Sequence, residues 1–152
     1  MESYQNKVER YTAIFNKINK RYNSISILRL LSVFLCLFLL FYYIKTNEIL
    51  YAAFAFLSFV GFLFLMRIHS KLSFKRELTK AILKINKNEI TYLKREKIPF
   101  ENGIEFNDFH HPYAYDLDVF GEHSLFQNIN RTATFIGKKT LANQLLNLSS
   151  NE

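Results

Sequence analysis

Six side chains between residues 110 and 123 are of the types that bind metal ions. They are His110, His111, Asp116, Asp118, Glu122 and His123. Imidazole and carboxylate groups are common ligands of Zn²⁺, but in known sites they recur at fixed spacings such as the helical H-E-x-x-H. These six follow no such spacing. Turn formation accounts for them better, since His111 precedes Pro112 and aspartates favour Asx turns. We therefore predict no metal site.

A second group resembles the end of a phosphate-binding loop. In the run Gly137, Lys138, Lys139 and Thr140, the glycine and first lysine fit the pattern G-x-x-x-x-G-K-[ST]. The rest does not fit, because Thr132 replaces the first glycine and Lys139 replaces the Ser or Thr. No paired nucleophile and base occurs elsewhere. We predict that this chain is not an enzyme and binds no cofactor by itself.

A long apolar region lies well upstream of these groups. Residues 25–66 hold only three charged side chains, although 22% of the chain is charged. Two apolar stretches cover most of this region, residues 25–44 and 49–68, and each is about 20 residues long, enough to cross a bilayer core of roughly 30 Å as a helix. Only residues 45–48 separate them, which predicts a transmembrane hairpin. Cys36, the only cysteine, is expected to face lipid or to fill packing space rather than carry redox chemistry.

Two other interpretations fit this region less well. A cleaved signal peptide has a short apolar core near the N-terminus, whereas here about 24 polar and amphipathic residues come first. A buried helical hairpin of a soluble protein needs a polar face, which residues 34–40 lack. Six Lys and Arg in residues 1–29 and ten in residues 67–97 flank the spans, with one between them. The positive-inside rule then predicts cytoplasmic termini and an inner (cytoplasmic) membrane location.

Amphipathic helices are predicted on both sides of the hairpin. Upstream, spacings of four and three residues connect Tyr4, Val8, Tyr11, Phe15, Ile18, Tyr22 and Ile25. Downstream, the same spacing connects Phe74, Leu78, Ala81, Ile85, Asn88 and Tyr92. Such heptad patterns predict an antiparallel coiled coil in the cytoplasm. The opposite face of the second helix carries Arg76, Lys80, Lys84 and Lys87, a candidate contact for anionic lipid, although such charge runs are usually only solvated.

The C-terminal third changes character. Residues 98–123 are acidic and aromatic and are expected to form an extended connector. Ser124 followed by Gln127 is a capping-box pattern that opens a helix, and a second helical run covers residues 134–148. Two such short helices are too small to bury their apolar faces without a partner. These faces are made of Leu125, Phe126, Ile129, Ile136, Leu141, Leu145 and Leu148.

Residues 124–146, SLFQNINRTATFIGKKTLANQLL, resemble the opening of the core domain of the MutS family of DNA mismatch-repair proteins. In that family a short helix ends in a Leu-Asp/Asn-x-Thr-x-Thr turn, which leads through x-Met/Phe-Gly into a helix ending in Trp-Leu or Leu-Leu. The matching positions are Ser124, Leu125, Asn130, Thr132, Thr134, Gly137, Leu141, Leu145 and Leu146. The preceding segment resembles the connector of a MutS-like subgroup with two N-terminal membrane spans. Its matching positions are His111, Pro112, Tyr113, Asp116, Leu117, Asp118, Phe120 and Gly121.

The resemblance implies that this chain is the N-terminal fragment, or a truncated copy, of a membrane-anchored MutS-like protein. The parent would be an ATPase that uses ATP and Mg, with its Walker A loop beyond Glu152. MutS carries its mismatch-reading Phe-x-Glu element in an N-terminal domain. No Phe-x-Glu occurs in residues 1–97, where the membrane hairpin stands in place of that domain. The implied partners are the lipid bilayer, the rest of the core domain and a second copy in a homodimer. DNA is expected to bind only weakly, or through the parent protein.

The predicted fold class is all-α, with a two-span transmembrane helical hairpin, an antiparallel cytoplasmic helix pair, a connector and a short helical segment. The alternative to a MutS-like anchor is a stand-alone two-span membrane scaffold or interaction protein. The predicted domain boundaries are 1–24 (amphipathic helix), 25–68 (transmembrane hairpin), 69–97 (basic amphipathic helix), 98–123 (acidic connector) and 124–152 (start of the MutS-like core domain).

Overall fold

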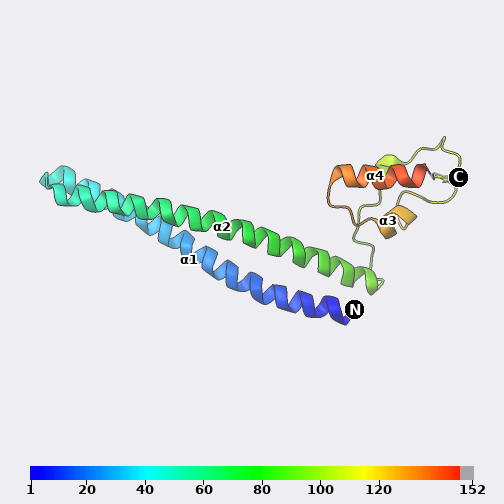
Figure 1. Cartoon of the computed structure of the whole chain (residues 1–152), viewed down its shortest axis with the longest axis horizontal. Helices are drawn as coiled ribbons and strands as arrows, with labels where there is room; N and C mark the ends of the chain where they lie inside the picture. The colour runs from blue at the N-terminus through cyan, green and yellow to red at the C-terminus, as the bar shows by residue number, and fades with distance from the viewer. Residues whose placement is uncertain (148–152) are drawn as a thin grey trace. The chain divides into compact units, whose positions relative to one another are not determined.

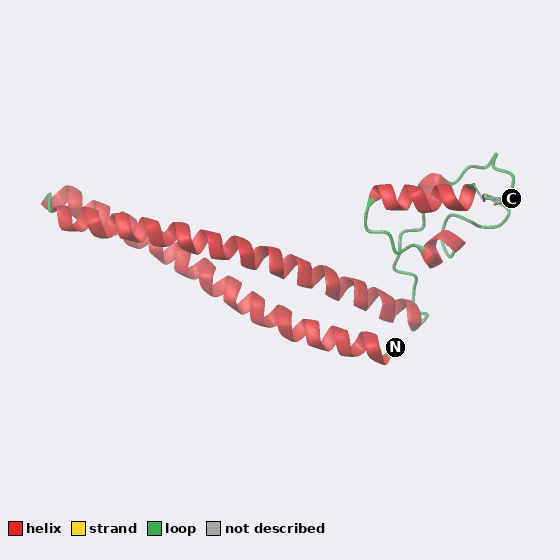
Figure 2. Cartoon of the chain, viewed as in Figure 1, coloured by secondary structure: helices red, strands yellow, loops and turns green. Residues whose placement is uncertain are grey.

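All regular secondary structure in residues 1–147, the part of the chain that the computed structural model describes, is helical (Figures 1 and 2). The all-α fold class is therefore confirmed for this part of the chain. Residues 148–152, with Leu148 of the predicted apolar face, lie outside it. The elements are α1 (Glu2–Thr46), α2 (Ile49–Leu93), the 3-10 turn η1 (Ile104–Phe106), α3 (Leu125–Ile129) and α4 (Phe135–Leu146).

The chain divides into two compact units. The first, here called the helix pair, comprises Glu2–Lys87, and the second, here called the small unit, begins at Asn88. In the helix pair, the Ser58 hydroxyl donates a hydrogen bond of 3.0 Å to the Ser32 carbonyl. Residue numbers therefore rise along α2 as they fall along α1, and the two helices run antiparallel and side by side (Figure 1).

Each long helix is continuous. The sequence distinguishes amphipathic stretches from apolar ones, but α1 and α2 each contain both stretches within 45 residues of uninterrupted helix. Neither glycine nor proline occurs in α1, and Gly61 is the only one of either type in α2. With almost no helix-breaking residue present, nothing in either sequence favours a bend where the side chains change from polar to apolar.

The ends of these helices have local causes. Asn47 ends α1 in the left-handed conformation, with φ of 59°, which Asn tolerates better than most residues. Its N–H donates to the Tyr43 carbonyl at 2.8 Å. α2 ends at Leu93 rather than at residue 97, because Arg95 adopts φ of 56° and Pro99 follows shortly after.

The small unit has a compact core that the connector helps to build. Phe126 of α3 is fully buried, and its ring lies 5.3 Å from Phe120 and 6.0 Å from Phe106, measured between centroids. Both partners come from the segment expected to be an extended connector. Ala114 and Val119 of that segment are buried in the same cluster. The connector therefore supplies much of the apolar partner that residues 124–146 were predicted to lack.

Backbone hydrogen bonds and a cap hold this arrangement. The Phe126 N–H donates to the Val119 carbonyl at 2.9 Å, which joins α3 to the connector. The predicted capping box is present in part. The Gln127 N–H donates to the Ser124 hydroxyl at 3.2 Å, but the Gln127 side-chain oxygen accepts from the His123 N–H at 2.7 Å, one residue before the N-cap. These bonds satisfy donors at the start of α3 that would otherwise lack partners.

Arg131 connects the end of α2 to the rest of the small unit. Its guanidinium makes a two-nitrogen contact with the Glu89 carboxylate, at 2.6 and 3.4 Å. The same group lies 3.5 Å from the centroid of the Phe100 ring and 4.9 Å from that of Tyr92. A planar guanidinium can bind a carboxylate with its edge while its face stacks on an aromatic ring. Arg131 therefore links its own segment and the segment around Phe100 to the last turns of α2.

We predict that Gly103→Ala destabilises the small unit by about 2 kcal/mol, the usual scale of overpacking. Gly103 has φ of +67°, and a Cβ there would lie 2.6 Å from Cδ1 of Phe126. Amide hydrogen exchange on the detergent-solubilised chain is the measurement, and the Phe126 amide should exchange faster. Gly61→Ala is the matched control, since nothing lies within 4 Å of a Cβ at that position. Unchanged exchange at Phe126 in the Gly103 variant would contradict this packing.

Candidate membrane anchor

Two helices of this chain are long and apolar enough to cross a membrane. In both α1 and α2, an 18-residue stretch reaches a mean hydropathy of 2.4, and its side chains are almost entirely unburied, with 0% and 6% buried inside the structure. Large apolar side chains such as Phe41, Phe56 and Phe64 point outward. An apolar surface of this extent is unusual for a protein in water and is typical of one that contacts lipid.

The seam predicted for α1 faces α2 and is longer than predicted. All seven predicted positions from Tyr4 to Ile25 are half-buried. The same spacing of four and three residues continues without a break through the apolar stretch, where the half-buried positions are Arg29, Ser32, Cys36, Leu39 and Tyr43. α1 therefore presents one narrow face to its partner along almost its whole length, as in a coiled coil.

The seam predicted for α2 is wrong at the four positions that lie in the helix pair, while Asn88 and Tyr92, which belong to the small unit, are half-buried. Phe74, Leu78 and Ile85, which were expected to face α1, are 72%, 52% and 61% exposed, and Ala81 is exposed as well. The observed inner face also follows the four-three spacing, but in another phase. Its buried or half-buried members are Tyr51, Ala55, Ser58, Phe62, Leu65, His69, Leu72, Arg76, Thr79, Leu83 and Asn86.

Small residues in the apolar stretch explain this phase. Ala55 is only 3% exposed, and its carbonyl accepts a contact of 3.6 Å from the Cys36 thiol. Together with the Ser58 to Ser32 hydrogen bond, this shows that the two backbones approach closely here, as small residues permit. Because α2 has no break between Ala55 and Asn86, the face that begins inward at Ala55 stays inward to the end of the pair.

Polar side chains in the seam are tolerated because they bond to their own helix. The hydroxyls of Ser26 and Thr79 donate to carbonyls four residues earlier, at 3.0 and 2.8 Å, and the Asn86 amide does the same at 2.8 Å. Such bonds satisfy buried polar groups without a partner on the other helix. In the sequence, the inner face of α2 is marked only by its four-three spacing, because its residues are not uniformly apolar.

Charged and aromatic groups meet near the end of the apolar stretches. Arg76 was expected on the wet basic face, but its guanidinium is stacked 5.0 Å from the centroid of the Tyr22 ring and 5.9 Å from that of Phe15. Arg29 lies 5.8 Å from the centroid of Phe62. The Nε atoms of both arginines are buried without a hydrogen-bond partner among the described residues. The other three candidate lipid contacts, Lys80, Lys84 and Lys87, are exposed.

His69 is the titratable group of this region. Its Nε2 lies 3.0 Å from the Ser26 hydroxyl, and its ring centroid is 4.3 Å from that of Tyr22. Burial, and secondly the positive charge of Arg29, lower the pKa of His69. The imidazole is therefore neutral at physiological pH. Because the Ser26 hydroxyl donates to the Tyr22 carbonyl, it accepts a hydrogen bond from His69 in the tautomer that carries its proton on Nε2.

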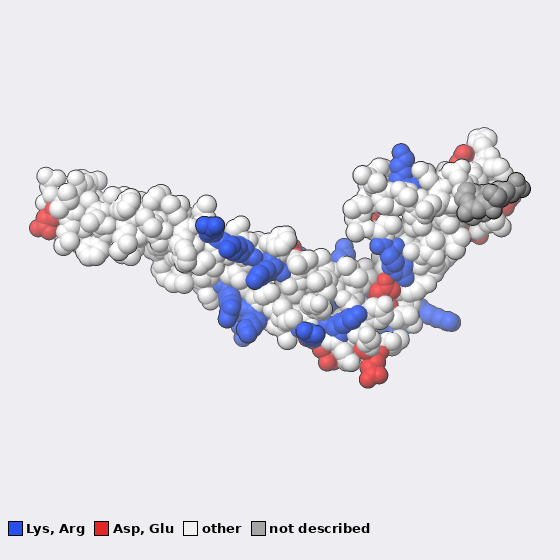
Figure 3. All heavy atoms as spheres, viewed as in Figure 1, with Lys and Arg blue, Asp and Glu red and all other residues white. Residues whose placement is uncertain are grey.

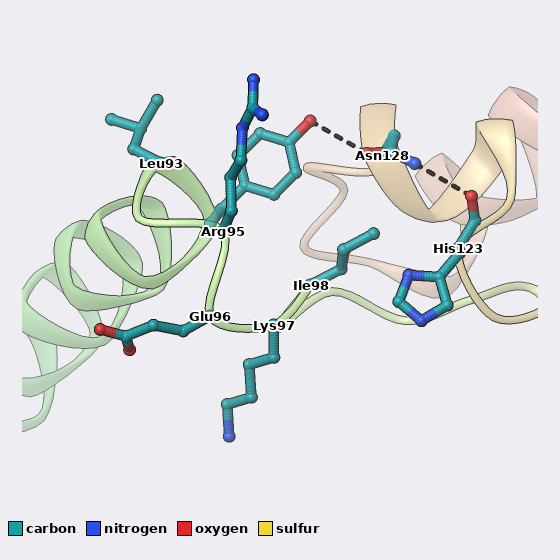
Figure 4. Close-up of a pocket in the computed structure, with 8 residues that line it drawn as sticks. Leu93, Arg95, Glu96, Lys97, Ile98, His123 and Asn128 are labelled. Atoms are coloured by element: carbon teal, nitrogen blue, oxygen red, sulfur yellow. Dashed lines mark hydrogen bonds between the residues drawn. The ribbon is translucent and has the colours of Figure 1, made fainter.

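A hollow in the small unit, lined by residues 92–93 and 95–98 with His123 and Asn128, is large enough to consider as a site, but its side chains do not converge. In Figure 4, Arg95, Glu96 and Lys97 point away from one another. The Asn128 amide is already used, since its oxygen accepts from the Tyr92 hydroxyl at 3.0 Å and its nitrogen donates to the His123 carbonyl at 3.2 Å. No polar groups remain aimed at a common point, as a ligand would require.

The six metal-type side chains have separate places in the small unit. Among the described residues, no three His, Cys, Asp or Glu side chains come together as a metal site requires. His111 lies 3.1 Å from the Leu146 carbonyl, and the exposed His110 lies 3.6 Å from Asp108. Asp118 and His123 adopt φ of 46° and 62°, which places them in tight turns.

The GKKT run serves the structure of the small unit. The Gly137 N–H donates to the Thr134 hydroxyl at 3.1 Å, so the start of α4 is capped by its own chain. Lys138 pairs with Glu101 at 2.7 Å and with Glu105 at 2.6 Å. Hydrogen bonding to Lys138 lowers the pKa of the Glu105 carboxyl. The lysine that a phosphate loop would aim at a nucleotide therefore connects α4 to the connector.

No protein-family model, no curated protein and no solved structure matches this chain.

The observed phase of α2 predicts opposite results for two neighbouring substitutions. Thr79→Lys should weaken the helix pair by about 3 kcal/mol, because it buries a second cation on the inner face that already holds Arg76. Leu78→Lys should change its stability by no more than about 0.5 kcal/mol, as is usual at exposed positions. Limited proteolysis of α1 in detergent measures both. Greater cleavage in the Leu78 variant than in the Thr79 variant would contradict the observed phase of α2 and support the seam expected from the sequence.

The helix pair should also weaken around His69 as the pH falls from 7.5 to 5.5. The pKa of His69 is lowered in the folded state, so its contribution to stability is present above about 6.5, the pKa in an unfolded chain, and is lost below it. Amide exchange of residues near Ser26 at the two pH values is the measurement. His69→Gln should remove the pH dependence, whereas His110→Gln should retain it, because that side chain is 98% exposed.

Proposed function

We propose that this chain is the membrane anchor and N-terminal part of a MutS-like ATPase. In this proposal α1 and α2 cross the inner membrane as a transmembrane hairpin, with residues 25–44 and 49–68 in the bilayer. The observation that carries the anchoring role is the contrast between the two sides of the pair. Outward-facing side chains are apolar, whereas the inner face holds Ser32, Ser58 and other polar groups. A protein in water shows the reverse distribution.

The distribution of charge supports an orientation with both termini in the cytoplasm. On the face seen in Figure 3, the end of the helix pair near the α1–α2 turn is almost free of blue and red atoms beyond the turn itself. Lys and Arg atoms begin only further along the pair, towards both termini. A bilayer around the uncharged part would place this basic region on one side, which the positive-inside rule assigns to the cytoplasm.

Two observations support the MutS-like part of the proposal. The first is the resemblance of residues 124–146 to the opening of the MutS core domain. The second is a set of exposed apolar side chains on the small unit, of which Phe135 and Ile136 are 67% and 77% exposed and Leu125 and Ile129 are 49% and 44% exposed. A larger domain would cover such side chains. ATP, Mg and DNA then belong to the parent protein.

A stand-alone two-span scaffold is the second candidate, and one observation favours it. Phe74, Leu78 and Ile85 form an exposed apolar stripe on α2 outside the proposed spans, which an interaction protein would offer to a partner helix. The coding sequence beyond Glu152 separates the two candidates. A continuation that contains a Walker A loop and an ATPase domain supports the MutS-like parent. An immediate stop codon contradicts it and leaves the scaffold.

The proposed topology predicts a labelling pattern. In a Cys36→Ala background, Glu48→Cys at the turn should react with a membrane-impermeant thiol reagent on intact cells or spheroplasts. Asn6→Cys should react only after the membrane is permeabilised. Both positions are exposed in the structure, so a difference in reactivity reports the side of the membrane. Labelling of Asn6→Cys alone would mean that the termini lie outside the cytoplasm. Equal labelling of both positions without permeabilisation would exclude a hairpin with cytoplasmic termini.

A further inference from the structure

A group of cations without carboxylates surrounds the helix pair where its apolar stretches end. Glu48, in the turn between the helices, is the only acidic residue between Glu9 of α1 and Glu77 of α2. The contact of Ser26 with His69 brings the ends of the two apolar stretches to the same part of the pair. The exposed Lys and Arg on either side of this contact, here called the cationic belt, are Lys17, Lys20, Arg21, Arg67, Lys71 and Lys75.

None of these six side chains forms a salt bridge within the described residues. Arg29 adds to the same charge from within the first apolar stretch. Its half-buried side chain has no acidic partner in the described part of the chain, and it lies over Phe62 instead. A guanidinium at that depth requires an anion nearby or must extend towards the headgroups. The region therefore carries positive charge that the protein itself does not neutralise.

Distance along the helices separates this belt from the basic residues further out. The polar layer on each side of a bilayer core is roughly 5–8 Å thick. At about 1.5 Å per residue, Arg21 lies about 6 Å and Lys71 about 5 Å beyond the apolar stretches 25–44 and 49–68. Lys80 and Lys87 lie about 18 and 28 Å beyond them by the same measure. By this measure Lys20, Arg21, Arg67 and Lys71 lie in the polar layer or at its edge. Lys17 and Lys75 lie just outside it, about 12 and 10 Å beyond the apolar stretches, and the outer lysines are much further away.

We propose that the cationic belt binds the headgroup phosphates of anionic phospholipids in the cytoplasmic leaflet. This inference rests on the proposed function, because it requires residues 25–44 and 49–68 to lie in the bilayer. It also replaces the lipid contact expected from the sequence. Arg76 is stacked on Tyr22 and Phe15 in the seam, and Lys80, Lys84 and Lys87 are too far from the headgroups.

The test compares lipid retention by the full chain and two matched variants. Each chain is purified in detergent with equal amounts of phosphatidylglycerol and phosphatidylcholine, and the bound lipid per chain is measured by native mass spectrometry. The belt variant is Lys20→Gln/Arg21→Gln/Lys71→Gln. The control, Lys80→Gln/Lys84→Gln/Lys87→Gln, removes the same charge from exposed positions of α2. Circular dichroism checks that both variants remain helical.

The wild-type chain should retain phosphatidylglycerol in preference to phosphatidylcholine, and the belt variant should lose about a hundredfold in this retention at low salt, since each cation near an anionic surface contributes to binding. The control should retain it as the wild type does. Equal loss in both variants would mean that only net charge matters and would overturn the proposal, as would no loss in the belt variant. Added inorganic phosphate should not displace the lipid, and displacement at millimolar concentration would point to a free-anion site instead.

A flotation assay separates failure of this inference from failure of the anchoring role. If the wild-type chain floats with liposomes of pure phosphatidylcholine but shows no preference for phosphatidylglycerol, the belt proposal fails and the anchor remains. If the chain does not float with liposomes of either composition, the anchor proposal itself fails. Flotation with both and a preference lost only in the belt variant supports both proposals.

Discussion

The close approach of α1 and α2 at Ala55 and Ser58 determines the rest of the helix pair. Ala55 has no side chain beyond Cβ, so the Cys36 thiol reaches its carbonyl, and the Ser58 hydroxyl reaches the backbone of α1. Neither contact can form if α2 rotates about its axis. An α-helix cannot change its rotational phase without a break, and α2 has none over 45 residues. The contacts made in the apolar stretch therefore decide which side chains face inward several turns away, at Thr79 and Asn86.

The small unit is held together instead by contacts between aromatic rings of the connector and of the helix that follows it. Phe106 and Phe120 of the connector enclose Phe126 of α3, and the tight turn at Gly103 leaves no room for a side chain against that ring. Arg131 then binds Glu89, which attaches the last turns of α2 to this unit. A core of this size buries little surface, and each of these contacts is a large part of its stability.

Local sequence was sufficient where one segment decides the outcome. The apolar stretches, the seam of α1 and the Ser124 cap of α3 all follow from spacing or from residue type within a few positions. The phase of α2 did not follow, because Phe74, Leu78 and Ile85 form a more apolar stripe than Arg76, Thr79 and Asn86, which face inward. That choice is made by packing around Ala55, some 20 residues away. The packing of the connector could not be predicted for a related reason, because Phe106 and Phe120 of the connector pack on Phe126, which lies in α3.

An uninterrupted heptad seam on both helices also restricts how the length of this pair can change. Adding one residue anywhere in α2 turns everything after it by about 100°, which would replace Thr79 on the inner face by a neighbour of different size and polarity. Adding seven residues to each helix keeps the rotation within about 20° of the original and lengthens the helix pair by about 10 Å. The reach of the helix pair is thus adjustable only in steps of about 10 Å, and only if both helices lengthen together.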